Sequence, residues 1–105
     1  MALQKTIQGS TARGQRVTWT YADGSAPDLR AATITGRLRK QNGGNTRAIT
    51  GTLVPDVAVG NRFVWTYSAA DVATSGWYEV QFTATYPDGT VERTFPEPWE
   101  VQVAL

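Results

Sequence analysis

The sequence predicts an all-β domain, an antiparallel β-sandwich of about seven to eight short strands. Apolar and polar residues alternate in short runs, and turns rich in Gly, Pro and Asp separate these runs. No run keeps the 3.6-residue period of a long amphipathic helix. The length of 105 residues suits one domain, residues 1–105, that buries a core of its own.

Residues 76–103 are predicted to form three consecutive antiparallel strands. Every second position of the first strand is apolar, which is typical of a strand with one buried face. These apolar residues are Tyr78, Val80, Phe82, Ala84 and Tyr86. Pro87-Asp88-Gly89 then supplies a hairpin turn, because Gly readily takes a positive φ. Residues 90–95 return as the second strand, Pro96 and Pro98 interrupt it, and residues 99–105 alternate again as the last strand.

Three strands are predicted in the first 40 residues. Residues 3–8 form a short edge strand. Residues 15–21 form a longer strand, rich in β-branched and aromatic types, whose inward side chains are Val17, Trp19 and Tyr21. After the loop 23–27, residues 33–40 form the third strand, which ends at the hairpin tip 41–45.

Two more strands are predicted between that tip and residue 67. In the first, Ile49, Gly51 and Leu53 alternate with threonines until Pro55-Asp56 turns the chain. In the second, alternation places three aromatic residues on one face: Phe63, Trp65 and Tyr67. The one helical signal is residues 68–74, where Ser68 is expected to cap a single turn that only connects two strands.

One local pattern favours an immunoglobulin-like arrangement of the sandwich. Gly76 and Tyr78 lead into a core strand, in the manner of the tyrosine corner of such domains. The chain has no cysteine, so the disulfide of antibody domains is absent, and Trp19 or Trp65 is expected to fill the core in its place. Burial is expected for Trp99 as well.

Composition argues against catalysis and against a cofactor. The chain has neither Cys nor His, which removes thiol chemistry, the commonest general base and the commonest transition-metal ligand. Its five Asp residues lie at turn or cap positions, where Asp bonds its own backbone: Asp23, Asp28, Asp56, Asp71 and Asp88. The spaced acidic ligands of a calcium loop and the Lys-Ser/Thr of a phosphate loop are both missing. The protein is therefore predicted to be neither an enzyme nor a metal or cofactor carrier.

Charge and hydropathy give little information about partners. The net charge of +1 produces no field that favours nucleic acid or an anionic membrane. The first residues lack the apolar core of a signal peptide, and no stretch approaches the roughly 20 apolar residues of a spanning helix. We therefore expect the chain to be made in the cytoplasm and to bind neither nucleic acid nor membrane.

Taken in order along the chain, these features resemble the small immunoglobulin-like domains of bacteriophage virions. The resemblance rests on Asp28-Leu29 before Ala32-Thr33-Ile34, on Phe63-Val64-Trp65, on Gly76-Trp77-Tyr78 and on the stretch FTATYPDGTVERTFP before a closing EVQV strand. It is greatest to the N-terminal module of phage baseplate upper proteins, which continue beyond the point where this chain stops. The resemblance implies a virion location in a tail, baseplate, neck or capsid decoration. It also implies contacts with other virion proteins, as a homo-oligomer or a symmetric array.

Five residues are candidates for such contacts. Trp77 falls on the opposite face from Tyr78, so it is predicted to project outward unless the connector 68–75 covers it. The threonines of the exposed strand faces can lie against a partner without burying charge, although Thr is also simply a good β former. Basic residues on the hairpin around residue 41 form a possible patch. The candidate interface residues are Trp77, Thr83, Thr85, Arg37 and Arg39.

A second function class stays open. Sandwich domains with exposed Trp or Tyr can stack sugars on the aromatic face, so a carbohydrate-binding module, with a host surface glycan as its ligand, is the alternative. Sugar binding that depends on Trp77 favours this alternative, whereas particle-bound or ring-shaped assembly without sugar favours the virion protein. Nucleic-acid binding is a weaker third option, since the basic hairpin lacks stacked aromatic residues.

Overall fold

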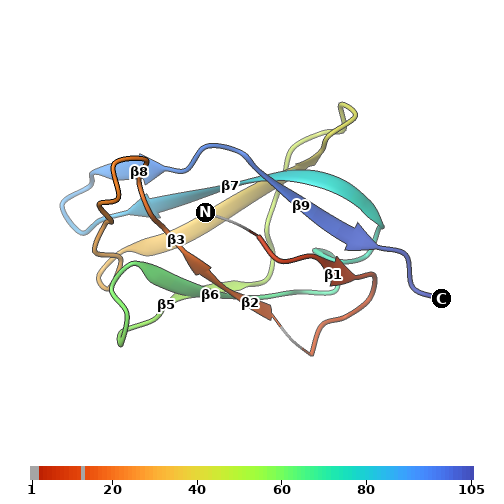
Figure 1. Cartoon of the computed structure of the whole chain (residues 1–105), viewed down its shortest axis with the longest axis horizontal. Coiled ribbons are helices and arrows are strands. Elements are labelled where there is room, and N and C mark those ends of the chain that lie inside the picture. Colours follow the sequence, from red (N-terminus) through yellow and green to blue (C-terminus); the bar gives the residue numbers. More distant parts are fainter. Residues whose placement is uncertain (1–2, 13) are drawn as a thin grey trace.

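The structure is a computed structural model that describes residues 3–12 and 14–105, and over these residues it is all-β with no helix (Figure 1). Within these two described ranges, nine strands form two sheets. The six-stranded sheet has the order β1-β9-β7-β3-β4, with β8 also paired to β7, and the three-stranded sheet has the order β2-β6-β5. The strands are β1 Thr6–Ile7, β2 Gly14–Thr18, β3 Thr33–Lys40, β4 Arg47–Ala48, β5 Thr52–Pro55, β6 Arg62–Thr66, β7 Gly76–Thr85, β8 Val91–Arg93 and β9 Glu97–Gln102.

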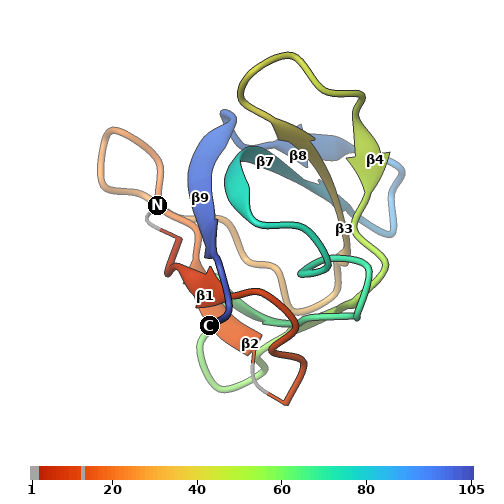
Figure 2. The ribbon, with the colours of Figure 1, turned by 90° about the vertical axis from the view of Figure 1, so that its right-hand side faces the viewer.

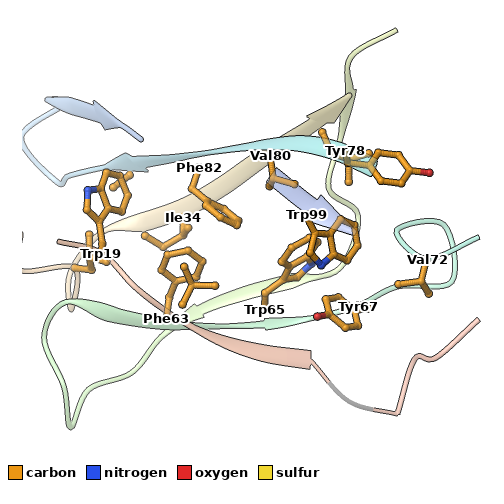
Figure 3. Close-up of a cluster of buried hydrophobic side chains, with 14 of the residues drawn as sticks. Trp19, Ile34, Phe63, Trp65, Tyr67, Val72, Tyr78, Val80, Phe82 and Trp99 are labelled. Atoms are coloured by element: carbon orange, nitrogen blue, oxygen red, sulfur yellow. The ribbon is translucent and has the colours of Figure 1, made fainter. Parts of the chain in front are cut away.

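The two sheets face each other across one apolar core, so the predicted two-layer packing is confirmed (Figures 1 and 3). Aromatic rings from opposite sheets meet at the centre. The ring centroids of Phe63 and Phe82 are 4.9 Å apart, and those of Trp65 and Trp99 are 4.6 Å apart. Trp19 is buried in the same cluster, so all three tryptophans predicted for the core lie there.

The prediction for residues 76–103 is right about the strands but wrong about their arrangement. β7 buries the expected face, and Gly89 takes a φ of 88° in the expected turn. However, β8 and β9 do not pair with each other as the second and third of three consecutive antiparallel strands. Both run antiparallel to β7 along the edge that β3 leaves free. The return strand after the hairpin is therefore one interrupted strand, and Figure 1 shows β8 and β9 following each other along β7.

The interruption is a β-bulge. Thr83 pairs with Arg93 and Val80 pairs with Glu97, so two residues of β7 face three residues of the return strand. Thr94 keeps the two strands hydrogen-bonded at this point. Its N–H donates to the carbonyl oxygen of Phe82, and its Oγ1 accepts from the N–H of Phe82, both at 3.0 Å. Phe95, the next residue, is 86% exposed.

The strand predicted after the hairpin tip is also divided. Its first part, β4, pairs with β3 in the six-stranded sheet, whereas its second part, β5, pairs with β6 in the other sheet. The chain changes sheets near Gly51, where a Cβ atom would collide with the carbonyl oxygen of Thr66. The close approach of two backbones at this crossing explains why glycine is required there.

A buried carboxylate fixes this crossing. Asp71 is fully buried, and its two oxygens accept hydrogen bonds from the backbone N–H groups of Thr50, Gly51 and Ser68 at 3.0 to 3.1 Å. The indole N–H of Trp65 donates to the same group at 3.3 Å. One side chain thus links the crossing, the core strand β6 and the connector that leads to β7.

The connector before β7 is a capped turn, as predicted. The N–H of Asp71 donates to Oγ of Ser68 at 3.2 Å while the N–H of Ser68 donates to the Asp71 carboxylate, which is the reciprocal pattern of a capping box. The hydroxyl of Tyr78 then donates to the carbonyl oxygen of Thr74 at 2.7 Å, the bond expected of a tyrosine corner.

The N-terminal strands differ from the prediction in three ways. The first strand is shorter, only Thr6–Ile7, and lies at the sheet edge as expected, but it runs parallel to β9, so the sandwich is not wholly antiparallel. A polar residue, Gln15, is buried beside the apolar inward residues of β2, and its amide forms hydrogen bonds with the backbone of Gln4 and the hydroxyl of Tyr67. Tyr21, predicted inward, is 37% exposed because β2 has already ended and a turn has begun.

The predicted turn positions of the Asp residues are confirmed. The carboxylates of Asp23, Asp28, Asp56 and Asp88 each accept from the backbone N–H two residues later. These bonds, together with side-chain donors, hold the pKa of all four carboxyl groups below the ordinary value. Side-chain donors are the largest cause at Asp23, Asp56 and Asp88, from Ser25, Arg62 and Thr90, and the backbone N–H of Arg30 is the largest cause at Asp28.

We predict that Asp71→Ala lowers the free energy of unfolding by about 3 kcal/mol or more, because it leaves the buried indole N–H of Trp65 and several partly buried backbone N–H donors without an acceptor. Asp71→Asn retains one acceptor oxygen and is expected to lose less, about 1 to 3 kcal/mol. Urea unfolding followed by the fluorescence of the buried tryptophans measures both. Asp88→Asn, in an exposed turn, is the matched control, with a loss of about 1 kcal/mol or less. Equal losses in the Asp71 and Asp88 variants would contradict the role given to Asp71.

A second prediction concerns acid. A carboxyl group whose pKa is lower in the folded than in the unfolded chain adds stability above its unfolded pKa, and loses it as the pH falls through the folded pKa. The free energy of unfolding is therefore expected to stay level from about pH 7 to 5 and to fall below about pH 4. Asp56→Asn removes one of the four groups, so the difference in the free energy of unfolding between wild type and variant should become smaller toward pH 2. A difference that stays constant with pH would contradict the assignment of Asp56.

Candidate interaction face

All five candidate residues lie on one surface, the outer face of the six-stranded sheet. Alternate residues of β3 and β7 point into the core, so the residues between them point out. Arg37 and Arg39 occupy outward positions of β3, and Trp77, Thr83 and Thr85 occupy outward positions of β7. Because β3 and β7 are neighbours, residues 40 positions apart in sequence become adjacent. We call this surface the CF face, in which C stands only for β3 and F only for β7, the two central strands of the sheet.

The pairing register arranges the CF face in rows across the sheet. Arg39 lies opposite Glu79, and their side chains form an ion pair of 3.0 Å. The next row places Arg37 opposite Gln81. The two rows after it are rich in threonine and run across β3, β7 and β8: Thr35, Thr83 and Arg93, followed by Thr33, Thr85 and Val91. Figure 2 shows how β3, β7 and β9 lie beside one another in this sheet.

Trp77 projects outward as predicted. Trp77 is 52% exposed and is not part of the buried cluster, so residues 68–75 do not bury it fully. Trp77 pairs with Glu100 of β9, at the end of the CF face opposite to the threonine rows. A large half-exposed aromatic ring with a polar neighbour is the kind of side chain that anchors interfaces.

Two adjoining depressions lie on the CF face. The smaller, about 210 Å³, is lined in part by Arg39, Glu79 and Pro96. The larger, about 370 Å³, lies toward the β7–β8 hairpin. Its wall includes Thr35, Arg37, Gln81, Thr83 and Arg93. Arg37 and Gln81 line both depressions, so the two form one continuous shallow surface.

The side chains on the CF face carry groups that recognise a surface. Within the part of the chain that the structure describes, no group of three or more His, Cys, Asp or Glu side chains could hold a metal ion. Glu79, the carboxylate nearest the centre of the face, is already paired with Arg39. Guanidinium, hydroxyl, amide and indole groups remain, and these groups recognise a surface through hydrogen bonds, charge and stacking.

Sequence reasoning missed Arg93, Gln81 and Thr35. The register of the β7–β8 hairpin, which follows from its Asp88-Gly89 turn, would have placed Arg93 opposite Thr83. The other two required the pairing of β3 with β7, which spans about half the chain and has no local signal.

No protein-family model matches the chain, and no curated protein matches it either. Over the described residues, the fold also contains no helix with the length and hydrophobicity needed to cross a membrane.

Proposed function

We propose that this domain is a structural or adaptor protein of a bacteriophage virion that acts through protein–protein contacts of the CF face. The observation that carries the proposal is the gathering of Trp77, Arg37, Arg39, Thr83 and Thr85 on one face of one sheet. Its partners are other virion proteins, in a tail, baseplate, neck or capsid decoration. The virion context comes from the sequence resemblance, and the choice of surface comes from the structure.

We also infer that the sandwich is immunoglobulin-like. In such domains the second, fifth and fourth strands form one sheet, and the third, sixth and seventh form the other. The orders β2-β6-β5 and β9-β7-β3 fit this scheme if the two-residue β4 is left out of the count and β8 and β9 together count as the interrupted last strand. Tyr78 lies two residues before the buried Val80, and its hydroxyl donates to the carbonyl oxygen of Thr74. This is the position and the hydrogen bond of a tyrosine corner, which supports the same inference.

The composition of the CF face suits a partner protein. Trp77 supplies a large apolar contact at one end, and the threonine rows supply hydroxyl groups without unpaired charge. Protein interfaces commonly have an aromatic or Arg anchor surrounded by polar contacts that exclude water. The half-exposed Trp77 is accordingly the expected anchor.

We predict that Trp77→Ala lowers incorporation of the protein into virions by at least about tenfold, which is the loss expected for an interface anchor. The protein is supplied from a plasmid to a phage that lacks its own copy, and mass spectrometry measures its amount in purified particles. Urea unfolding of the free variant should change by less than about 1 kcal/mol, since the side chain lies outside the core.

Val57→Ala is the matched control for this experiment. Val57 is 75% exposed in the turn before β6, away from the CF face, and its removal should leave incorporation unchanged. Absence of the wild-type chain from purified particles would overturn the proposed function. Equal losses for the Trp77 and Val57 variants would overturn the choice of the CF face.

Carbohydrate binding is the second candidate, and the exposure of Trp77 beside Glu100 is the observation that favours it. A sugar ring stacked on an indole commonly forms hydrogen bonds to neighbouring polar groups. If this function is correct, a glycan array shows saturable binding that Trp77→Ala abolishes and Val57→Ala retains. Assembly into particles with no glycan signal favours the virion protein instead.

A further inference from the structure

The larger depression of the CF face contains two arginines with no acidic partner. Its wall is formed by Thr35, Gly36, Arg37, Ala48, Gln81, Thr83 and Arg93. No carboxylate lines this depression, and neither Arg37 nor Arg93 forms an ion pair with any residue that the structure describes. Arg39, the neighbouring basic residue, differs because Glu79 already neutralises it.

The register sets the spacing of the two arginines. Arg93 on β8 and Thr35 on β3 both pair with Thr83, so they lie on opposite sides of β7 in one row. Arg37 is two residues farther along β3. Two strand spacings across the sheet and two residues along it separate their Cα atoms by about 12 Å. The flexible side chains can close part of this distance, so their guanidinium groups can reach two acidic groups of one ligand.

The remaining wall offers hydrogen bonds and little bulk. Thr35 and Thr83 carry hydroxyl groups, and Gln81 carries an amide whose Nε2 donates to the carbonyl oxygen of Thr94. Ala48, which lies opposite Arg37 on β4, has a small side chain and leaves room for a backbone to approach the sheet. These groups fit an extended peptide better than a compact ion.

We propose that this depression binds an extended acidic segment of a partner protein, with Arg37 and Arg93 each holding one carboxylate. Carboxylates two residues apart on an extended chain project from the same side at about 7 Å, a spacing that two flexible arginines can match. This inference rests on the proposed function, because it specifies the chemistry of the partner that the CF face binds.

Other polyanions fit the depression less well. Single-stranded nucleic acid is held by aromatic side chains that stack on its bases, and no aromatic residue lines this depression. The net charge of +1 also gives no long-range attraction for nucleic acid or a sulfated glycan. An acidic peptide needs only the two local charges and the hydrogen bonds of the wall.

The test uses a labelled peptide of four Glu-Ser repeats as the probe and the 105-residue protein as it exists. Backbone amide NMR shifts are followed during titration at low salt. We expect saturable shifts confined to β3, β7 and β8, none with the matching Gln-Ser peptide, and weaker binding as salt is raised. The double variant Arg37→Gln, Arg93→Gln should weaken binding by at least about tenfold.

The control double variant is Arg16→Gln, Arg30→Gln. Arg16 lies on β2 of the other sheet and Arg30 in an exposed turn, so the net charge falls equally while the depression is unchanged. Equal weakening in both double variants would overturn the inference, because it would show only a general charge effect. No localised shifts, or tighter binding of heparin or an oligothymidine than of the acidic peptide, would also overturn it.

Failure of this inference can be distinguished from failure of the proposed function. If Arg37→Gln, Arg93→Gln enters particles normally while Trp77→Ala does not, the CF face still binds a virion partner but the depression does not hold an acidic segment. If the wild-type chain is absent from particles, the proposed function itself fails.

Discussion

The buried carboxylate of Asp71 is the interaction on which the rest of the sandwich depends. Its oxygens accept hydrogen bonds from the chain crossing between the sheets, from the connector before β7 and from the indole of Trp65. An N–H group removed from water without an acceptor is costly, so this carboxylate stabilises the crossing near Gly51. The same side chain holds the connector from which β7 starts. Asp71 therefore influences which residues of β7 enter the core and which, like Trp77, form the CF face.

The edges of the six-stranded sheet explain why the CF face, and not the β8–β9 edge, is the better surface for a partner. The carbonyl oxygen of Gln102 accepts from the N–H of Gln8 at 2.8 Å, so it points away from β7. Alternation gives the backbone of Pro98 the same direction, and proline has no N–H to offer an added strand. The bulge at Thr94 breaks the same edge a few residues earlier. Proline and bulges are common protections against edge-to-edge pairing. Recruitment of a partner strand is thus disfavoured along this edge.

Local patterns predicted the faces of the strands well but predicted their partners poorly. β3 has the predicted bounds, and β6 and β7 bury the predicted side chains, because alternation and turn residues are properties of neighbouring positions. The parallel pairing of β1 with β9 and the division of one predicted strand at Gly51 depend on residues far apart in sequence. The same limit applies to the candidate site. The alternation of residues within one strand predicts that Trp77 faces outward, whereas its grouping with Arg37 requires the β3–β7 register. Arg93 is intermediate, because the Asp88-Gly89 turn predicts the register of its hairpin and hence that it lies opposite Thr83.

The shallow CF face suits the structural role in a symmetric particle that we propose. Each copy offers one half-exposed aromatic anchor, rows of hydroxyl groups and two arginines without an acidic partner among the described residues. A single contact of this kind is weak, because binding must offset the lost freedom of both partners before any net affinity remains. When many copies are held together, each further contact forms at a high effective concentration, and the combined affinity exceeds that of one face by several orders of magnitude. A protein that repeats around a particle can therefore rely on a shallow polar face, whereas a freely diffusing enzyme or receptor needs a deep pocket for a comparable affinity.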